Sequence, residues 1–457
     1  MSKRLLLTDV ELGGIRTDVR VKAGIVTDVG SLGRQSGELQ LAGAGRSLLA
    51  GLHDHHCHVL ATAAALDSVD CSSPLITNTS DLAAALSSAK TVNGWIRGVG
   101  YDELVAGHLD ALALDRLSPA IPTRIQHRSG AMWVVNTPGL ESLHLDDFEL
   151  AGIERDDSGR PTGRLWRLDD WLHEQLGSIN TDVARVSSML AEQGVTGVTD
   201  ASPGLSTDAV QTLIDGGFRQ RLVSLGEPHD QALLGPKKIV LPDHQLPSLA
   251  ELRRKIAAAR PRAVAIHCVT RAALALTLAV LREIGSWTGD RIEHAAVCPP
   301  ELTQCMSALG LAVVTQPSMI TRRGDAYARL VDADDVPYLW PFASLVAAGV
   351  PVGCSSDAPY GDANPWESVA AAVGRLSASG RALAPAERVD AITALRGYLS
   401  AYDAPGGAPR EIRPGVPADL CLLDRPLAAA LAHPQDVQVV LTVVDGEAIH
   451  DTTGRYA

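Results

Sequence analysis

Residues 51–58 read Gly51-Leu52-His53-Asp54-His55-His56-Cys57-His58, a polar end to an apolar strand-like run. In a strand, alternate side chains point to the same face, so Asp54, His56 and His58 share one face. Two imidazoles at positions i and i+2 can therefore bind one metal ion from a single strand end. We interpret Asp54 as a hydrogen-bond acceptor that orients one of these histidines.

The opposite face of the same strand carries His53 and His55. The alternation rule turns both away from the predicted metal site, and we interpret them as packing or outward-facing residues. A His-x-His pair alone is a weak signal, so the interpretation depends on what the rest of the chain brings to this strand end.

Seven further short apolar segments follow and alternate with Ala/Leu-rich helical runs such as 249–259, 271–284 and 300–309. With the strand that ends at His58 they make eight β/α units, which favours a distorted TIM (β/α)8 barrel over an open sheet. Catalytic residues of such barrels lie at the strand ends. The seven predicted strands are 196–200, 221–225, 238–241, 264–267, 291–294, 312–316 and 350–354.

Both chain ends are rich in short strands with period-2 patterns. They predict a small β-sandwich domain built from residues 1–50 and 400–457, with the barrel domain spanning 51–399. The stretch 60–180 is too long for one β/α unit and predicts an inserted cap subdomain at about 90–175. Four of the seven tryptophans lie there, either as its own core or as the lining of a pocket.

Composition narrows the class of protein. The chain has 457 residues, 46% hydrophobic and 20% charged, with a net charge of −13 that gives no footprint for nucleic acid. Seven scattered cysteines without a CxxC pair indicate reduced thiols. No apolar run is long enough for a membrane span and no secretion signal is recognisable, so we expect a cytoplasmic protein with a small-molecule substrate, which can form homo-oligomers.

Lys238 begins one of the predicted strands. A protonated lysine would repel a metal ion, whereas a lysine carbamate offers carboxylate-like oxygens that can bridge two metals. Lys237 is the rival position, and the alternation rule gives no preference between the two. A pair of solvated lysines at the strand start is the other alternative.

His267, His294 and Asp357 each lie at or near the end of a predicted strand. A carboxylate at position 357 can bind a metal ion and take a proton from metal-bound water, whose pKa zinc lowers to about 7. The alternative for Asp357 is the N-cap of the following helix. Nitrogen and carboxylate ligands suit zinc first, with manganese or iron as other options.

The stretch 51–58, together with Arg291-Ile292-Glu293-His294, Ser355-Ser356-Asp357 and Gly415-Val416-Pro417-Ala418-Asp419-Leu420, resembles the amidohydrolase superfamily. More narrowly it is similar to the amidohydrolase-3 type, the YtcJ-like metal-dependent hydrolases. Residues 95–103 and 126–133 are also similar to that branch. The resemblance spans nearly the whole chain, and Ala50 departs from the proline that the family usually has before the glycine.

This resemblance implies a barrel with a terminal β-sandwich and a site for one or two divalent metal ions. By motif position, one metal would be held by His56, His58 and Asp357. A second would be held by His267 and His294, with a carboxylated Lys238 as the bridge. Asp357 would act as general base and then as acid towards the leaving group.

Substrate contacts are predicted from position. His127 is a candidate to polarise the scissile carbonyl, and Tyr101 and Arg128 lie in the same inserted region. Arg322, its neighbour Arg323, and Tyr360 follow the last two barrel strands, where arginine suits a substrate carboxylate.

We therefore predict a metal-dependent hydrolase that cleaves a C–N bond of an amide, N-acyl or cyclic amide compound. Family deaminases have a glutamate three residues after the strand-five histidine, where this chain has Thr270. Deamination, ester hydrolysis and a lyase step are the alternatives at the same site, and a catalytically silent ligand-binding protein is a third hypothesis. A nucleotide-binding glycine loop and a Gly-x-Ser-x-Gly elbow are both missing from the sequence.

Overall fold

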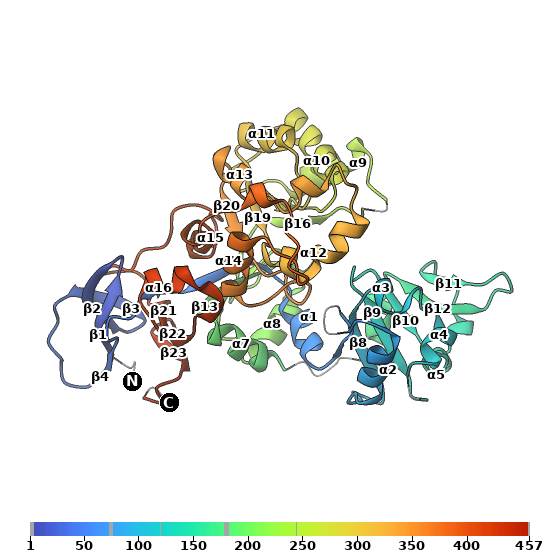
Figure 1. The fold of residues 1–457 in the computed structure, drawn as a ribbon, viewed down its shortest axis with the longest axis horizontal. Coiled ribbons are helices and arrows are strands. Elements are labelled where there is room, and N and C mark those ends of the chain that lie inside the picture. The colour runs from blue at the N-terminus through green and yellow to red at the C-terminus, as the bar shows by residue number, and fades with distance from the viewer. Residues whose placement is uncertain (1–3, 73–75, 119, 178–181, 244, 456–457) are drawn as a thin grey trace. The chain divides into compact units, whose positions relative to one another are not determined.

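The computed structural model describes residues 4–72, 76–118, 120–177, 182–243 and 245–455 (Figure 1). The chain divides into two compact units, Met1–Val59 with Val183–Ala457, and Leu60–Asp182. The predicted boundaries at 50, 400 and about 90–175 stay predictions. In the part of the chain that the structure describes, no helix is long and apolar enough to cross a membrane.

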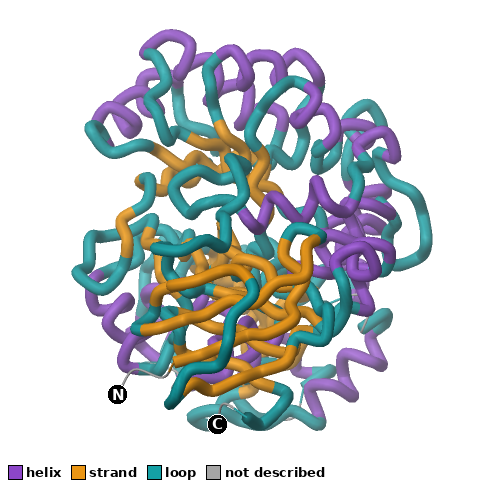
Figure 2. Tube along the Cα trace, turned by 90° about the vertical axis from the view of Figure 1, so that its left-hand side faces the viewer, coloured by secondary structure: helices purple, strands orange, loops and turns teal. Residues whose placement is uncertain are grey.

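The first unit contains two four-stranded sheets built from the chain ends (Figures 1 and 2). One has the order β3-β2-β1-β4 and the other the order β23-β22-β21-β5. Leu7 and Val21 of the first sheet share one hydrophobic core with Leu420 and Val443 of the second. The strands are β1 (Arg4–Leu12), β2 (Ile15–Lys22), β3 (Ile25–Gly30), β4 (Glu38–Ala42), β5 (Leu48–Ala50), β21 (Leu420–Leu423), β22 (Val439–Val444) and β23 (Glu447–Asp451).

Two parallel sheets carry the rest of this unit, with the orders β15-β14-β13-β6 and β16-β17-β18-β19-β20. All eight strands predicted from the sequence are present, which confirms the alternating pattern. Their bounds are β6 (Leu52–Cys57), β13 (Val195–Asp200), β14 (Arg221–Ser224), β16 (Lys237–Val240), β17 (Val264–Cys268), β18 (Arg291–His294), β19 (Ala312–Thr315) and β20 (Val352–Cys354), with the short β15 (Leu233–Leu234) in addition.

A few backbone hydrogen bonds connect these two sheets. The backbone N–H of Lys238 donates to the carbonyl of Leu225, beyond β14, at 3.2 Å. At the other edges, the N–H of Asp357 donates to the carbonyl of His56 at 2.8 Å. Backbone hydrogen bonds therefore link the residues that follow β14 with β16, and the residues that follow β20 with β6.

Helices follow the strands and cover them from outside, as α9, α10, α11 and α13 show in Figure 1. The predicted helices 249–259, 271–284 and 300–309 are confirmed, the third ending one residue earlier. Ser248 begins α9 with a capping box, and the Thr270 hydroxyl caps α10. The helices are α7 (Val183–Glu192), α8 (Thr207–Asp215), α9 (Leu249–Ala259), α10 (Arg271–Ile284), α11 (Pro300–Ala308), α12 (Ser318–Leu330), α13 (Ala343–Ala347), α14 (Pro365–Gly374), α15 (Ala391–Leu399) and α16 (Leu427–Ala432).

The second unit is built on a sheet of order β11-β12-β10-β9-β8-β7. Trp95 and Trp133 are buried in its core and Trp171 packs against them, whereas Trp166 is 46% exposed. Three of the four tryptophans therefore serve the core of this unit. Its elements are α1 (Val59–Leu66), β7 (Val69–Asp70), α2 (Thr79–Ser87), β8 (Ile96–Tyr101), α3 (Glu103–Ala106), α4 (Ala111–Asp115), β9 (Thr123–His127), β10 (Met132–Val135), α5 (Thr137–Ser142), β11 (Ile153–Arg155), β12 (Pro161–Trp166) and α6 (Asp169–Leu176).

Candidate metal centre

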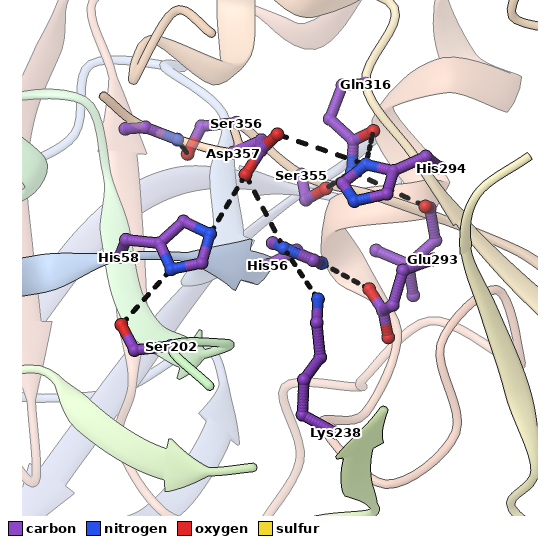
Figure 3. A network of polar contacts seen from close by, with 12 residues as sticks. His56, His58, Ser202, Lys238, Glu293, His294, Gln316, Ser355, Ser356 and Asp357 are labelled. Carbon is purple, nitrogen blue, oxygen red and sulfur yellow. Dashed lines mark hydrogen bonds and ion pairs between the residues drawn. The ribbon is translucent and has the colours of Figure 1, made fainter. Parts of the chain in front are cut away.

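Three potential ligands meet where β6 and β20 end (Figure 3). One ligand atom each of His56, His58 and Asp357 lies within 4.8 Å of the others. Asp357 Oδ1 is 3.2 Å from His58 Nε2 and 3.5 Å from His56 Nε2. His56 and Asp357 are buried, and His58 is partly buried. Two imidazoles and a carboxylate in this arrangement suit a divalent cation.

Hydrogen bonds on the far side of each ring turn the Nε2 atoms towards Asp357. His56 Nδ1 donates to the Glu293 carboxylate, which leaves His56 Nε2 with a lone pair. His58 Nδ1 is 3.1 Å from the Ser202 hydroxyl. The His56 Nε2 lone pair faces Lys238 Nζ at 3.2 Å and Asp357 Oδ1 at 3.5 Å.

Asp357 occupies a turn with a left-handed backbone, φ 54°. Such a conformation is rare for a residue other than glycine and is often found at functional sites. The Asp357 carbonyl accepts hydrogen bonds from the N–H groups of Tyr360 and Gly361, at 2.8 and 3.2 Å. The N-cap alternative for Asp357 is wrong, since the next helix, α14, is capped by Asn364.

Asp54 is hydrogen-bonded to the turn that carries Asp357. Its carboxylate accepts hydrogen bonds from the N–H of Ser356 at 3.0 Å, from the Ser356 hydroxyl, and from the N–H of His56 at 3.1 Å. Asp54 therefore acts on the ligand His56 as an acceptor, as predicted, but through the backbone N–H of His56 rather than through its ring. Asp54 joins the end of β6 to the turn that carries Asp357.

Lys238 and Lys237 lie on opposite faces of β16. Lys238 is buried, and its Nζ lies 3.2 Å from His56 Nε2 (Figure 3). Lys237 is partly buried and pairs with Glu227 at 3.4 Å. Of the two lysines, Lys238 is therefore the one beside the histidines.

His294 and His267 form the opposite side of the cluster. Their ring centroids are 4.5 Å apart, and the His294 ring is 4.8 Å from that of His56. His294 Nδ1 donates to Gln316 Oε1 at 2.9 Å, which leaves His294 Nε2 with a lone pair. The backbone of His294 is left-handed, φ 73°, so the strand alternation ends at this residue.

The protonation states favour metal binding by these groups. Burial, followed by the charge of Lys238, lowers the pKa of His56 to about 3, so the ring is neutral. Burial likewise lowers the pKa of Lys238. Burial raises the pKa of Asp357, but the hydrogen bond with His58 and the nearby His56 and His294 outweigh it and hold the pKa well below its usual value.

Sequence reasoning missed three side chains that hold the ligands: Glu293, Ser202 and Gln316. Glu293 Oε1 also accepts from Arg291 Nε at 2.6 Å, so a buried ion pair stands behind His56. The signal available was alternation along β18, which puts Glu293 on the same face as Arg291 and one residue before His294.

The neighbouring histidines His53 and His55 are buried and bonded elsewhere. His53 Nε2 is 2.9 Å from the Thr199 hydroxyl, and His55 Nε2 is 2.9 Å from the Ser400 hydroxyl. Of the two alternatives left open for them, packing is the one observed.

Of the predicted substrate contacts in this unit, Tyr360 lies nearest to a candidate ligand. Its ring centroid is 5.7 Å from that of His58 in an edge-to-face arrangement. Arg322 donates to the Gly361 carbonyl at 3.2 Å, and Arg323 donates to the Tyr360 carbonyl at 3.0 Å. Both arginines thus contact the turn that follows Asp357.

The remaining predicted residues, Tyr101, His127 and Arg128, belong to the second unit. The Tyr101 hydroxyl donates to the Gly107 carbonyl at 2.6 Å. His127 Nε2 is 3.0 Å from the Glu103 carboxylate, and Arg128 pairs with Asp102 at 2.7 Å. Their assignment to substrate binding and, for His127, to catalysis stays a prediction.

Known proteins resemble this chain over almost its whole length. An N-substituted formamide deformylase from Arthrobacter pascens is 27% identical over 489 residues, covering 90% of each chain. An uncharacterized metal-dependent hydrolase from Pyrococcus horikoshii OT3 superimposes with a TM-score of 0.73 at 19% identity, covering 98% of this chain and 100% of that chain. Atrazine chlorohydrolase from Arthrobacter aurescens TC1, complexed with zinc, gives 0.57 at 13% identity, covering 98% and 95%.

These structural likenesses concern the fold alone, at identities below 20%. The family model described as the amidohydrolase family matches residues 43–450, which include both parallel sheets and every residue of the candidate metal centre. The chain therefore belongs to the amidohydrolase family.

Proposed function

We propose that this protein is a metal-dependent hydrolase that cleaves a C–N bond of a small amide, N-acyl or cyclic amide compound. The observation that carries the proposal is the convergence of His56 Nε2, His58 Nε2 and the Asp357 carboxylate within 4.8 Å, with the His56 lone pair fixed by Glu293. A divalent cation held by these residues, zinc by donor type, would lower the pKa of water to about 7 and so would supply a nucleophile at neutral pH.

Asp357 is suited to move the proton in this reaction. Its carboxylate lies 3.2 Å from His58 Nε2 and 3.5 Å from His56 Nε2, so it is within reach of a water at this centre and can take its proton. As the new C–O bond forms and the C–N bond breaks, the same proton passes from Asp357 to the leaving nitrogen. The products are a carboxylic acid and an amine.

Lys238 has a role in the same proposal. Lys238 Nζ is buried 3.2 Å from His56 Nε2, and burial lowers its pKa, which favours the neutral amine that reacts with carbon dioxide to give a carbamate and a proton. The carbamate would bridge to a second metal ion held by His267 and His294. Native mass spectrometry tests this assignment: wild type and Lys237→Gln should carry the added mass of one carbon dioxide, and Lys238→Gln should lack it.

The fold that we propose for this chemistry is a distorted (β/α)8 barrel with a β-sandwich formed from both termini. Closure of the barrel is supported by the hydrogen bonds Lys238 N to Leu225 O and Asp357 N to His56 O at the sheet edges. The sandwich is supported by the core that the two terminal sheets share. The metal centre would then lie at the carboxyl ends of the barrel strands.

N-formyl amines are the first substrates to test, because the similar enzyme from Arthrobacter pascens is named an N-substituted formamide deformylase. Deamination is disfavoured at this site, since Thr270 caps α10 and hydrogen-bonds to Asp243 at 3.1 Å where the family's deaminases have a glutamate. Ester hydrolysis and a lyase step share the same groups and are separated by their products.

A panel of N-formyl, N-acyl and cyclic amides, with esters and aminated rings as comparisons, tests the proposal. Carboxylate, amine, ammonia and carbon dioxide are each assayed with the wild type and with Asp357→Asn. Carboxylate and amine formed in equal amounts by the wild type alone are expected. Equal turnover by Asp357→Asn contradicts the proposal, and ammonia as the sole nitrogen product would indicate a deaminase.

A further inference from the structure

Two arginines lie directly opposite each other in the sheet of the second unit, where β8 and β9 run side by side (Figure 1). Arg97 of β8 and Arg124 of β9 are register partners in this parallel pair. Both guanidinium groups lie over the Trp133 ring, at 5.1 and 4.8 Å from its centroid. Like charges opposite each other destabilise a sheet unless something neutralises them.

The two arginine side chains differ in their hydrogen-bond partners. Arg97 donates to the Ala64 carbonyl at 2.9 Å and to the Ser68 hydroxyl at 2.5 Å. Arg124 is only 8% exposed, and its buried Nε has no hydrogen-bond partner. Within the residues that the structure describes, the Arg124 guanidinium makes no ion pair or hydrogen bond. Burying a charge in this way is costly without a partner.

Loss of a proton does not remove this charge at neutral pH. Burial, followed by the charge of Arg97, lowers the pKa of Arg124 to about 10, so the guanidinium remains charged. The acid beside Trp133 is Asp169, and its Oδ1 accepts from the Trp133 indole at 2.8 Å and from Gln126 Nε2 at 3.4 Å. The charge of Asp169 acts on Arg124 and raises its pKa, but in the described part of the chain the Asp169 carboxylate makes no hydrogen bond with that guanidinium.

A small cavity of about 20 Å³ lies against both arginines. Its lining includes Arg97, Arg124, Trp95 and one acid, Asp67, so that two positive charges face one negative charge. A space of this size holds about one or two water-sized groups. It shares Asn93, Trp95 and Leu176 with a neighbouring hollow of about 460 Å³.

We propose that Arg124, with Arg97, binds the carboxylate group of a small monocarboxylate in this cavity. The flat guanidinium matches the two oxygens of a carboxylate, and the volume fits those two oxygens but leaves little room for a tetrahedral phosphate. The larger hollow would receive the rest of the ligand. None of the residues that line this site is a proposed metal ligand or a predicted substrate contact of the hydrolase reaction.

Thermal unfolding of the full-length protein tests the binding. Sodium acetate replaces sodium chloride at constant ionic strength, and the Tm is followed for the wild type, Arg124→Gln and a matched control, Arg160→Gln. Arg160 lies in the same unit but is exposed and paired with Asp156. Acetate can also coordinate a metal ion, so the measure of the site is the part of the shift that Arg124→Gln loses.

We expect a saturable rise of several degrees in the wild type and Arg160→Gln, with at least a tenfold weaker acetate dependence in Arg124→Gln. Identical acetate curves for the wild type and Arg124→Gln would overturn the proposal. Equal stabilisation by chloride would also overturn the proposal, because the site would then bind a halide rather than a carboxylate.

A second variant tests the proposal by the direction in which the Tm changes. Arg124→Met keeps an apolar side chain against Trp133 but removes the unpaired charge, so the Tm without carboxylate should rise by several degrees and no longer respond to acetate. A lower Tm that still responds to acetate would show that Arg124 serves only as packing. A crystal grown with bromoacetate provides the location: a bromine anomalous peak beside Arg124 is expected, and a fully occupied peak elsewhere with none there contradicts the site.

Discussion

The metal centre and the Arg97–Arg124 pair are both buried and charged, but they are completed differently. At the centre, each buried charge or ring has a partner supplied by the chain: Glu293 holds His56, and Arg291 holds Glu293. At the pair, Arg124 has a tryptophan face and a cavity, and no carboxylate in the described part of the chain makes an ion pair or a hydrogen bond with it. The difference suggests that the chain itself orients the ligands of a cation, whereas the second unit depends on an anion from outside.

The largest effect is expected from Asp357→Asn, which keeps the size of the side chain but removes its charge and its capacity to accept a proton. Turnover of the best substrate should fall by about 10³-fold or more, because ligand and general base are lost together. Steady-state kinetics measure the loss, and circular dichroism shows whether the fold is kept. A folded variant with a kcat within tenfold of the wild-type value would contradict the role of Asp357, since the charge at position 357 would then be dispensable.

Glu293→Gln tests whether the partner behind His56 matters for the metal ion. Loss of the carboxylate weakens the acceptor that fixes the His56 ring, and zinc affinity should fall about 10- to 100-fold. Competition with a chromophoric chelator measures the dissociation constant directly. The matched control is Glu387→Gln, a buried carboxylate that accepts the N–H groups of Phe342 and Ser344; it should leave zinc affinity unchanged. Equal affinities in the two variants would contradict the assigned role of Glu293.

Glu38→Gln removes the buried counter-charge of Arg20 in the terminal sheet. It leaves Arg20 poorly paired, as Arg124 is in the second unit. Glu38 Oε1 accepts from Arg20 Nε at 2.5 Å and Oε2 from the N–H of Gln35 at 2.7 Å. We expect a loss of about 2 kcal/mol in the free energy of unfolding at pH 7, measured by urea denaturation.

This loss should depend on pH in a known direction. Burial raises the pKa of Glu38, but the N–H of Gln35 and the Arg20 guanidinium outweigh it and lower the pKa below 4.5. A lowered folded-state pKa gives stability that is present above pH 4.5 and is lost as the pH falls through the lower folded-state value. The wild type and Glu38→Gln should therefore converge below pH 4.5; a gap that widens there would refute the ion-pair account.

The smallest effect is expected from Lys237→Gln. Lys237 is partly buried and reaches only Glu227, at 3.4 Å, so both the Tm and kcat should stay close to wild type, with less than about 0.5 kcal/mol of destabilisation. Lys238→Gln, one residue along, should lose most activity. If the two variants behaved alike, the distinction between the buried Lys238 and the partly buried Lys237 would fail.

Much of the fold could be predicted from the sequence because its pattern is local. Eight short apolar strands and the helices at 249–259 and 271–284 follow from composition and spacing within each segment. The positions of His56, His58 and Asp357 at strand ends follow from the same pattern.

The partners of those ligands depend on contacts between distant segments. Glu293 meets His56 across 237 residues, and Ser202 meets His58 across 144. Alternation also fails at His294, where a positive φ ends the strand. Lys238 and Lys237 could not be distinguished until the register of β16 with its neighbours was known, since a shift of one residue exchanges the two faces.

Metal analysis of the full-length protein, purified without chelator, tests whether His56 and Asp357 bind a divalent ion that the reaction needs. The wild type, His56→Ala and Asp357→Asn are compared by elemental analysis after gel filtration. We predict about one or two divalent ions per wild-type chain and a clear loss of metal in both variants. The activity of each protein should follow its metal content. A wild-type chain that hydrolyses its substrate without any divalent ion, or variants that keep the full complement, would contradict it.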